Sequence, residues 1–299
     1  YTTAISDLTY KEICSVSFDE ISQRDTPLDI TSTATLERYR LVDCAAVVSN
    51  RVLRIEEFME FPRVIYAALS YVWRGNSLAN NNPSQEFSVR GAEDADPIGL
   101  DVLHDACASS LVCGASHLWL DRLCIMQTNK QDKWWQIREM YRLYCFATVC
   151  VVIPGGLRFL VSFSEETEWI HRGWTLQEVV APPSVAVLRA SSHGHGGLYA
   201  EGADGTSYGM LEVVTAQWSA MTSLQFALDA STIGHFQWIA SDDATVETAS
   251  CLVIAAALFG KQSSDPSASY HRNTVRILLP IQRFPCGDNG RQHPCNARD

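Results

Sequence analysis

The segment HRGWTLQEVVAPP, residues 171–183, combines side chains that could do chemistry with a helix short enough to hold them together. The two prolines near its end stop any helix that begins here. Side chains three and four positions apart share a helix face, so Trp174, Gln177 and Glu178 would lie together. With Arg172 just before them, these residues could contact a ligand. An aromatic plug beside a surface ion pair would have the same spacing.

The opposite face of this helix is aliphatic, with Leu176, Val179 and Val180 at helical spacing. Apolar side chains gain free energy when they leave water, so we expect this face to be the buried one. Replacing Leu176 or Val180 by alanine would then lower the free energy of unfolding by about 2–4 kcal/mol.

Four apolar runs predict the strands that would position this helix: VIYAALSYVW (64–73), HLWLD (117–121), ATVCVVIP (147–154) and SVAVLRA (184–190). Helical spacing of apolar residues extends from Pro97 to Cys113 and begins again at about Asp132. One stripe of the second of these helices would consist of Trp134, Ile137, Tyr141, Tyr144 and Thr148. The alternation of strand and helix is typical of a parallel sheet with helices on its faces, and it predicts the α/β class.

The carboxyl ends of parallel strands meet at one edge of a sheet, where loops and helix N-termini gather around ligands. The predicted strands and the short helix place aromatic, arginine and acidic side chains at this edge. The candidates are Ser70, Tyr71, Trp73, Arg74, Asp121, Arg122, Cys124, Gln127, Arg172, Trp174, Gln177 and Glu178. Together they have the composition of a pocket for a flat, partly anionic ligand.

Several candidates also fit structural roles. Tyr71 and Trp73 are typical of core aromatics at a strand end. Asp121 is equally able to cap the turn that follows it. The Pro154–Gly156 turn, whose glycines would allow close backbone approach, is no P-loop, because the GK[ST] element is missing.

Two further arrangements are weak signals for chemistry. Cys124 would need a base such as His117 or His171 to act as a nucleophile, and a buried structural thiol is the favoured interpretation. The SHGHGG segment contains His193 and His195 without further ligands, which is a poor match to a metal site. The sequence therefore predicts no resident metal.

The composition is that of a globular protein, with 299 residues of which 46% are hydrophobic and 19% charged. A formal net charge of −11 argues against a general nucleic-acid binder and against binding to an anionic membrane surface, since both favour Lys and Arg. Ten scattered cysteines without a CxxC pair indicate reduced thiols, and hence a cytoplasmic protein. The longest apolar run, at 251–259, is too short to span a bilayer. The chain begins with Tyr, as a fragment or processed chain would, and has no signal-peptide layout.

The expected organisation has three parts. Residues 1–62 form an N-terminal extension, in which RYRLVDCAAVVSNRVLRIEEF predicts two short strands. Residues 63–190 form the α/β domain. Residues 191–299 begin with a Gly- and Ser-rich linker or long loop, continue with an Ala-rich and mainly helical stretch over 210–260, and have no assigned role.

Four blocks of the α/β domain resemble, in order and spacing, the fungal heterokaryon-incompatibility (HET) domain: YAALSYVWRG, HLWLDRLCIMQ, WWQIREMYRLYCFATVCVVIPGG and RGWTLQE. The resemblance covers about residues 63–190, and one departure is Arg74, which is inserted where the family usually runs from tryptophan directly to glycine. It implies a role in fungal non-self recognition and regulated cell death. HET domains are in turn similar to TIR domains, so a TIR-like, flavodoxin-like parallel sheet is also implied.

The same resemblance implies a reaction. Many TIR domains carry a W-C-x-x-E segment whose glutamate is needed to cleave NAD. Trp174 and Glu178 have this spacing, while Thr175 stands where cysteine is common. Glu178 is thus the expected catalytic carboxylate of an NAD hydrolase, with NAD as substrate and no cofactor. A homo-oligomer with an upstream signalling partner is the expected assembly.

The chemistry requires few groups. Breaking the bond between ribose and nicotinamide expels a neutral leaving group from a cationic ring, so no general acid is needed, unlike ordinary glycoside hydrolysis. A carboxylate beside the developing oxocarbenium ion stabilises it. The substrate's rings could stack on Trp73 or Trp174, and Asp121 would orient an arginine. The arginines that could hold the diphosphate are Arg74, Arg122 and Arg172. The alternative is a non-catalytic signalling module that acts by self-association or partner binding.

Overall fold

The computed structural model describes the backbone of residues 10–76, 85–162, 165, 167–191, 196–202, 205–216, 218–227, 235–240 and 246–250. Side chains are described over the same residues except those in 196–211 and 235–250. All of these residues belong to one compact unit of the chain, Tyr1–Gln262.

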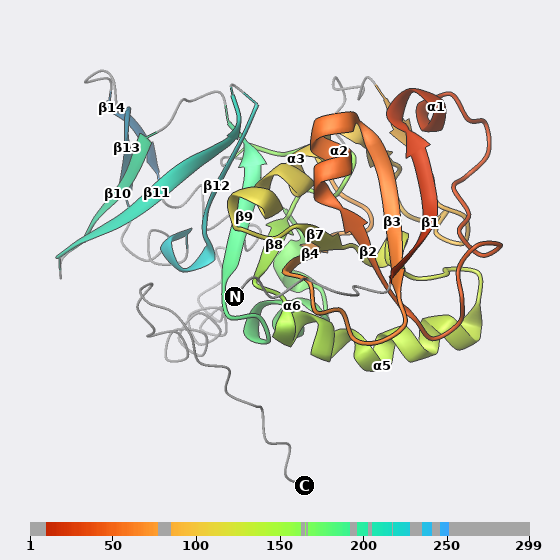
Figure 1. Ribbon diagram of the computed structural model, residues 1–299. Coiled ribbons are helices and arrows are strands. Elements are labelled where there is room, and N and C mark those ends of the chain that lie inside the picture. Colours follow the sequence, from red (N-terminus) through yellow and green to blue (C-terminus); the bar gives the residue numbers. More distant parts are fainter. Residues whose placement is uncertain are drawn as a thin grey trace, which may run out of the picture. The chain divides into compact units, whose positions relative to one another are not determined.

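Four parallel strands form the centre of this unit (Figure 1). They are β4 (Tyr66–Tyr71), β7 (His117–Trp119), β8 (Val149–Ile153) and β9 (Val185–Ala190), and each lies in a run that the sequence predicts. Their spatial order is β7-β4-β8-β9, so the first strand along the chain lies between the second and the third. Every side chain of β4 and β8 is buried, as expected for apolar strands covered on both faces. The predicted α/β class is confirmed.

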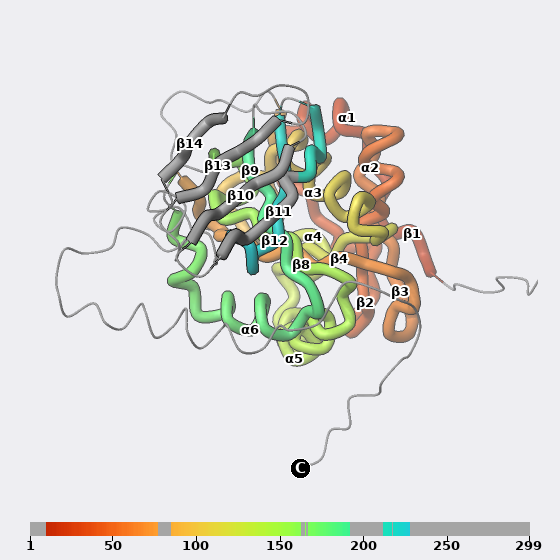
Figure 2. The backbone as a smooth tube through the Cα atoms, turned by 90° about the vertical axis from the view of Figure 1, so that its left-hand side faces the viewer, coloured from red at the N-terminus to blue at the C-terminus, as the bar shows by residue number. Residues whose placement is uncertain are grey.

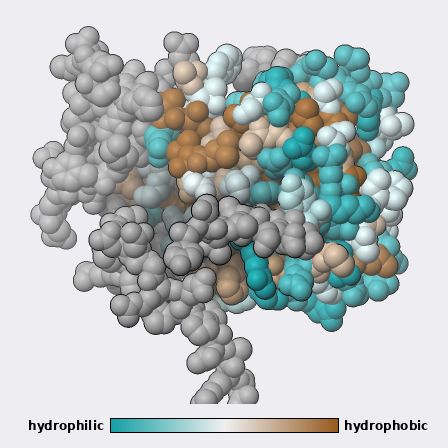
Figure 3. Space-filling view, in the orientation of Figure 1, coloured by the Kyte–Doolittle hydropathy of each residue, from teal (hydrophilic) through white to brown (hydrophobic). Residues whose placement is uncertain are grey.

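Helices cover both faces of these strands. Figures 1 and 2 together show α2 and α3 on one face and α5 and α6 on the other. The helical elements here are α2 (Cys44–Asn50), α3 (Leu100–Val112), α4 (Asp121–Cys124), α5 (Lys130–Phe146), the 3₁₀ turn η1 (Trp169–His171) and α6 (Thr175–Val180). Figure 3 shows hydrophobic residues gathered over α3, where Leu111 and Val112 are exposed. Within the described part of the chain, every helix is too short or too polar to cross a membrane.

The buried face of α5 differs from the predicted stripe. Trp134 and Tyr141 are exposed. The buried residues are Asp132, Gln136, Met140, Leu143 and Tyr144. The interior supplies partners for the polar ones, because the Arg40 guanidinium pairs with the Asp132 carboxylate at 2.9 Å and Gln136 Nε2 donates to a backbone carbonyl at 2.7 Å. Tyr144 of the predicted stripe is buried, but the rest of the buried face differs, because apolar spacing cannot reveal polar groups that are buried with partners.

Residues before the α/β domain extend its sheet. The strands β1 (Tyr10–Ser17), β2 (Tyr39–Asp43) and β3 (Val52–Phe58) are antiparallel, in the order β1-β3-β2, and β2 pairs with β7. The two strands predicted between residues 39 and 58 are confirmed, with α2 between them. A short helix, α1 (Phe18–Ser22), follows β1, and the pair β5 (Glu86–Phe87) and β6 (Ile98–Gly99) precedes α3.

The chain after β9 forms further strands where a linker and helices were expected. The strands are β10 (Gly196–Gly202), β11 (Gly205–Thr215), β12 (Ser219–Ser223), β13 (His235–Ala240) and β14 (Val246–Ser250). They are antiparallel and continue the sheet in the order β9-β12-β11-β10-β13-β14. The helical prediction is wrong over these strands, because aromatic and β-branched residues in GTSYGMLEVVT and HFQWIA favour a pleated surface. Residues 251–260 of the predicted helical stretch lie outside the described residues.

Candidate functional site

The helix α6 presents its carboxylate to the interior and its aliphatic face to solvent. Glu178 is only 4% exposed, whereas Leu176 is 60% and Val180 41% exposed. Val179 alone of the three aliphatic residues is buried. The expectation that the aliphatic face is the buried one is therefore wrong. The interior offers hydrogen-bond partners to Glu178, which a helical wheel does not show.

The partners of Glu178 come from β4 and from the turn before α6. Ser70 Oγ donates to Glu178 Oε2 at 2.5 Å, and Arg172 Nη1 lies 3.3 Å from the same oxygen. Burial raises the pKa of the Glu178 carboxyl, while Arg172 and the hydrogen bond from Ser70 lower it. The site thus contains a carboxylate that is largely withdrawn from water and held by one cation and one hydroxyl.

Trp169 is the member of this cluster that the sequence did not reveal. Its side chain is 1% exposed, and its indole Nε1 donates to Ser70 Oγ at 2.8 Å. Its carbonyl oxygen accepts from Thr175 Oγ1 at 2.7 Å. In EWIHRGW this residue is indistinguishable from an ordinary core tryptophan, because the partner of its indole is 99 positions away in the chain. No local spacing could have identified it.

A second cluster forms around Asp121, where β7 ends. Tyr71 donates its hydroxyl to Asp121 Oδ1, and Trp73 Nε1 donates to Asp121 Oδ2 at 3.1 Å. Burial, and next the negative charge of Asp121, raise the pKa of Tyr71 far above its ordinary value. Asp121 also raises the pKa of Glu178, so the two clusters are close enough to interact electrostatically. The ends of β4 and β7 and the helix α6 converge as the sequence predicts.

The arginines beside the second cluster are bound to the backbone. Arg122 Nη1 donates to the carbonyl of Asp96, and its guanidinium lies 5.7 Å from the centre of the Tyr71 ring. Arg74, which is exposed, donates to the carbonyl of Asp94 at 2.6 Å. Among the described residues, the Asp121 carboxylate accepts hydrogen bonds from Tyr71, Trp73 and the backbone N–H of Arg122, and none of these bonds orients an arginine side chain.

The remaining four candidates lie apart from Glu178 or face outward. Cys124 is fully buried and its Sγ accepts from Leu120 N at 3.5 Å, and burial raises the pKa of its thiol to about 12. This environment fits the structural role favoured for it. Trp174 is 49% exposed, and Gln177 is half-buried on α6. Gln127 donates through Nε2 to the carbonyl of Asp121 at 2.9 Å and so supports the turn at α4.

The Pro154–Gly156 turn approaches another part of the backbone closely. A Cβ added to Gly75 would lie 1.8 Å from the carbonyl oxygen of Gly155, and Asn76 N donates to this oxygen at 3.1 Å. Gly156 has a φ of +94°, which side chains rarely permit. The glycines therefore join the loop after β4 to the turn after β8 and fix the edge at which Ser70 lies.

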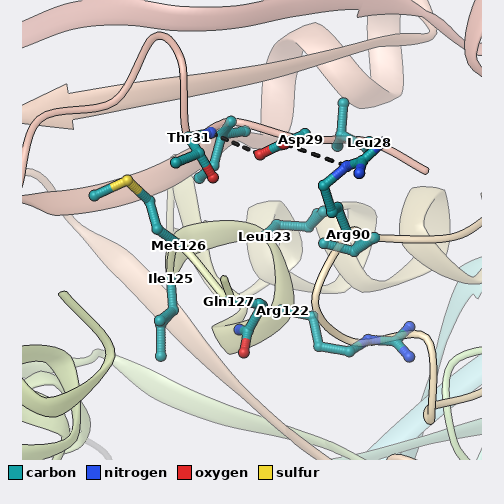
Figure 4. Close-up of a pocket in the computed structure, with 11 residues that line it drawn as sticks. Leu28, Asp29, Thr31, Arg90, Arg122, Leu123, Ile125, Met126 and Gln127 are labelled. Carbon is teal, nitrogen blue, oxygen red and sulfur yellow. Dashed lines mark hydrogen bonds and ion pairs between the residues drawn. The ribbon is translucent and has the colours of Figure 1, made fainter. Parts of the chain in front are cut away.

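A cavity of about 10 Å³ lies on the other side of α4, between residues 28–31, 89–90 and 122–127 (Figure 4). It has room for about one water molecule. Arg122 and Gln127 contribute to its lining, and Arg122 Nε and Gln127 Oε1 are buried without a partner among the described residues. Glu178 is not part of its lining. The described residues also contain no cluster of three or more His, Cys, Asp or Glu that could hold a metal. His193 and His195, of the weak metal signal, lie outside the described residues.

Part of this edge is similar to known proteins. Residues 66–158 match the family model described as Heterokaryon incompatibility protein (HET). The chain is 27% identical over 134 residues to Vegetative incompatibility protein HET-E-1 of Podospora anserina, a match that covers 40% of this chain and 9% of that protein. No solved structure matches the chain. The family match contains Ser70 and Asp121 and ends before Trp169 and Glu178.

Proposed function

Since the chain carries a HET domain over residues 66–158, we propose that it acts in fungal non-self recognition and regulated cell death. The name of the Podospora anserina relative, a vegetative incompatibility protein, supports this role. The chain corresponds to only 9% of that relative, so the activity is argued from this chain's own residues.

We further propose that the protein cleaves the bond between nicotinamide and ribose in NAD, with Glu178 as the catalytic carboxylate. The observation that carries this proposal is the carboxylate of Glu178, which is 4% exposed and lies against Ser70 and Arg172 at the carboxyl edge of parallel strands. A carboxylate withdrawn from water acts on a developing positive charge more strongly than one in water, because the local dielectric constant is lower.

The strand order supports a ligand site at this edge. In chain order the central strands are arranged second, first, third, fourth, which is the order that begins a flavodoxin-like sheet. Ligands of such sheets bind beyond the carboxyl ends of the strands, where the strand order reverses. In this chain that point lies between β4, which carries Ser70, and β8. A TIR-like architecture for the domain is part of the same proposal.

Substrate binding would exchange the partners of two charged groups. The nicotinamide ring of NAD is cationic and could replace the Arg172 guanidinium beside Glu178. Arg172, whose side chain is 24% exposed, would then be free to bind the diphosphate, where it could make two parallel hydrogen bonds. Because Arg74 and Arg122 are bound to backbone carbonyls, Arg172 is the arginine best placed for this contact. Trp174 offers an exposed ring on which a substrate ring could stack.

Binding of two dinucleotides of different charge tests this exchange without turnover. Carba-NAD has the cationic ring but a methylene in place of the ribose oxygen, and NADH has a neutral ring with the same diphosphate. The protein should bind carba-NAD about tenfold more tightly than NADH, or ~1.4 kcal/mol. Glu178→Gln should remove this preference and the exposed Glu168→Gln should keep it, as measured by titration calorimetry. Equal affinity for the two dinucleotides in the parent protein would contradict the proposal.

A second function is favoured by a separate observation. Leu176 and Val180 give α6 an exposed apolar surface, and such surfaces are typical of contacts with other proteins. On this alternative the protein is a non-catalytic signalling module, and α6 contacts a second copy or a signalling partner. The two functions make opposite predictions for Glu178→Gln, which should leave a purely associative module unaffected.

A further inference from the structure

Trp169 connects β4 to the segment that carries Arg172 and Glu178. Its indole N–H is bound to Ser70 Oγ at 2.8 Å on β4. Its carbonyl oxygen accepts from Thr175 Oγ1 at 2.7 Å and from Arg172 N at 3.3 Å. The same residue thus holds the hydroxyl that contacts the carboxylate and the first turn of the helix that carries the carboxylate.

The two hydrogen bonds that link Trp169, Ser70 and Glu178 have a fixed direction. An indole N–H can only donate, so Ser70 Oγ must be the acceptor of the bond from Trp169. Ser70 has a single hydroxyl proton, which it donates to Glu178 Oε2 at 2.5 Å. The donation from Trp169 polarises the Ser70 hydroxyl and makes it a better donor. A hydroxyl that donates to a carboxylate stabilises the charged form of the carboxyl group.

We propose that Trp169 is a positioning residue that acts through Ser70 to keep Glu178 ionised and correctly oriented inside the protein. The importance of this for a reaction rests on the proposed function. The charge state of Glu178 can nevertheless be measured without any substrate. Nothing in the chain's local sequence or in the matched family segment, which ends at residue 158, assigns such a role to Trp169.

A pH titration of the protein labelled with ¹³C at the glutamate side-chain carboxyls measures this directly, with Glu178→Gln identifying the signal of Glu178. Ser70→Ala and Trp169→Phe should each move the titration midpoint of Glu178 upward, the first by more. Trp119→Phe is the matched control, because Trp119 is equally buried and its Nε1 has no partner among the described residues. It should leave the midpoint where it is.

The double variant separates a relay from a general structural effect. In the Ser70→Ala background, Trp169→Phe should produce no further shift of the Glu178 midpoint. The Ser70 hydroxyl that connects the Trp169 indole to the Glu178 carboxylate is already absent from this background. A further shift of similar size, or an unchanged midpoint in Trp169→Phe alone, would overturn the proposal.

A second measurement uses the unaltered indole. In the parent protein the indole ¹⁵N–H signal of Trp169 should titrate with the midpoint of Glu178, and in Ser70→Ala it should cease to do so. This keeps the test decisive even where Trp169→Phe fails to fold, and an indole signal that ignores the titration in the parent protein would overturn the relay. Because none of these readouts involves NAD, their failure is distinct from a failure of the proposed reaction.

Discussion

Ser70 and Glu178 are 108 positions apart in the chain and share a 2.5 Å hydrogen bond inside the protein. One lies in β4 and the other in α6, so the contact exists only after the parallel sheet has formed and the turn at Trp169 has folded back onto it. The candidate site is therefore a property of the tertiary structure. Neither the strand nor the helix contains it alone.

Removing the Ser70 hydroxyl should destabilise the protein. Ser70→Ala leaves the buried indole N–H of Trp169 and one oxygen of Glu178 without this partner, and a buried polar group that loses its partner costs about 1–3 kcal/mol. Denaturation in urea measures the loss. Ser109→Ala is the matched control, because Ser109 is also buried but donates only to the carbonyl of Ala106 within its own helix. An equal loss for the two variants would argue against the special position of Ser70.

The pH dependence of stability should reveal the buried carboxyl. Burial raises the pKa of Glu178 above its ordinary value of 4.5, so the folded protein holds the proton of this group more tightly than the unfolded chain does. The contribution of Glu178 to stability is then greatest below pH 4.5 and falls as the pH rises through the folded-state pKa. Glu178→Gln removes this fall. Thermal melting from about pH 4 to about pH 8 should show the melting temperature of Glu178→Gln rising relative to that of the parent protein as the pH passes through the folded-state pKa. Above that pH the difference between the two melting temperatures should stay constant. Parallel curves would contradict a raised pKa.

The outer face of α6 should contribute little to stability. Leu176→Ala and Val180→Ala should each change the free energy of unfolding by less than about 1 kcal/mol, because both side chains are exposed on the surface. Leu188→Ala, at a fully buried position of β9, should cost about 2–4 kcal/mol. Sedimentation of the same variants tests the associative function, which predicts weaker self-association or partner binding for Leu176→Ala. A cost at Leu176 as large as that at Leu188 would show that the aliphatic face is buried after all.

Cys124 should not react while the protein is folded. Its thiol is fully buried with a pKa of about 12, so almost none of it is the reactive thiolate at neutral pH. Alkylation with iodoacetamide, followed by mass mapping, should modify the half-buried Cys145 before Cys124. Rapid modification of Cys124 in the folded protein would restore its candidacy as a nucleophile.

The sequence predicts the central elements well because their signals are local. Unbroken apolar runs identify β4 and β8, and helical spacing identifies α3 and α5. The orientation of α6 could not be predicted in this way. A helical wheel shows which side is more apolar, but it does not show that the interior holds Ser70 and Arg172 as partners for Glu178.

The same limit applies elsewhere in the chain. Asp132 is buried because Arg40 approaches it from β2, 92 positions earlier, and no spacing within α5 indicates this. The strands β10 and β11 lie in a Gly-rich stretch whose composition is typical of a linker, and they are held as strands by pairing with each other and with their neighbours. Convergence of Tyr71, Trp73 and Asp121 was predictable because it follows from the parallel order alone.

Release of nicotinamide from NAD tests the central claim most directly. Purified parent protein, Glu178→Gln and Glu168→Gln are compared at equal folded concentration, and nicotinamide is quantified by chromatography. The parent and the exposed-site control should release nicotinamide at the same rate, and Glu178→Gln should be slower by about 10²–10³-fold, the size expected when a charge-stabilising group is removed. Equal rates for all three proteins would show that the buried carboxylate of Glu178 takes no part in the reaction.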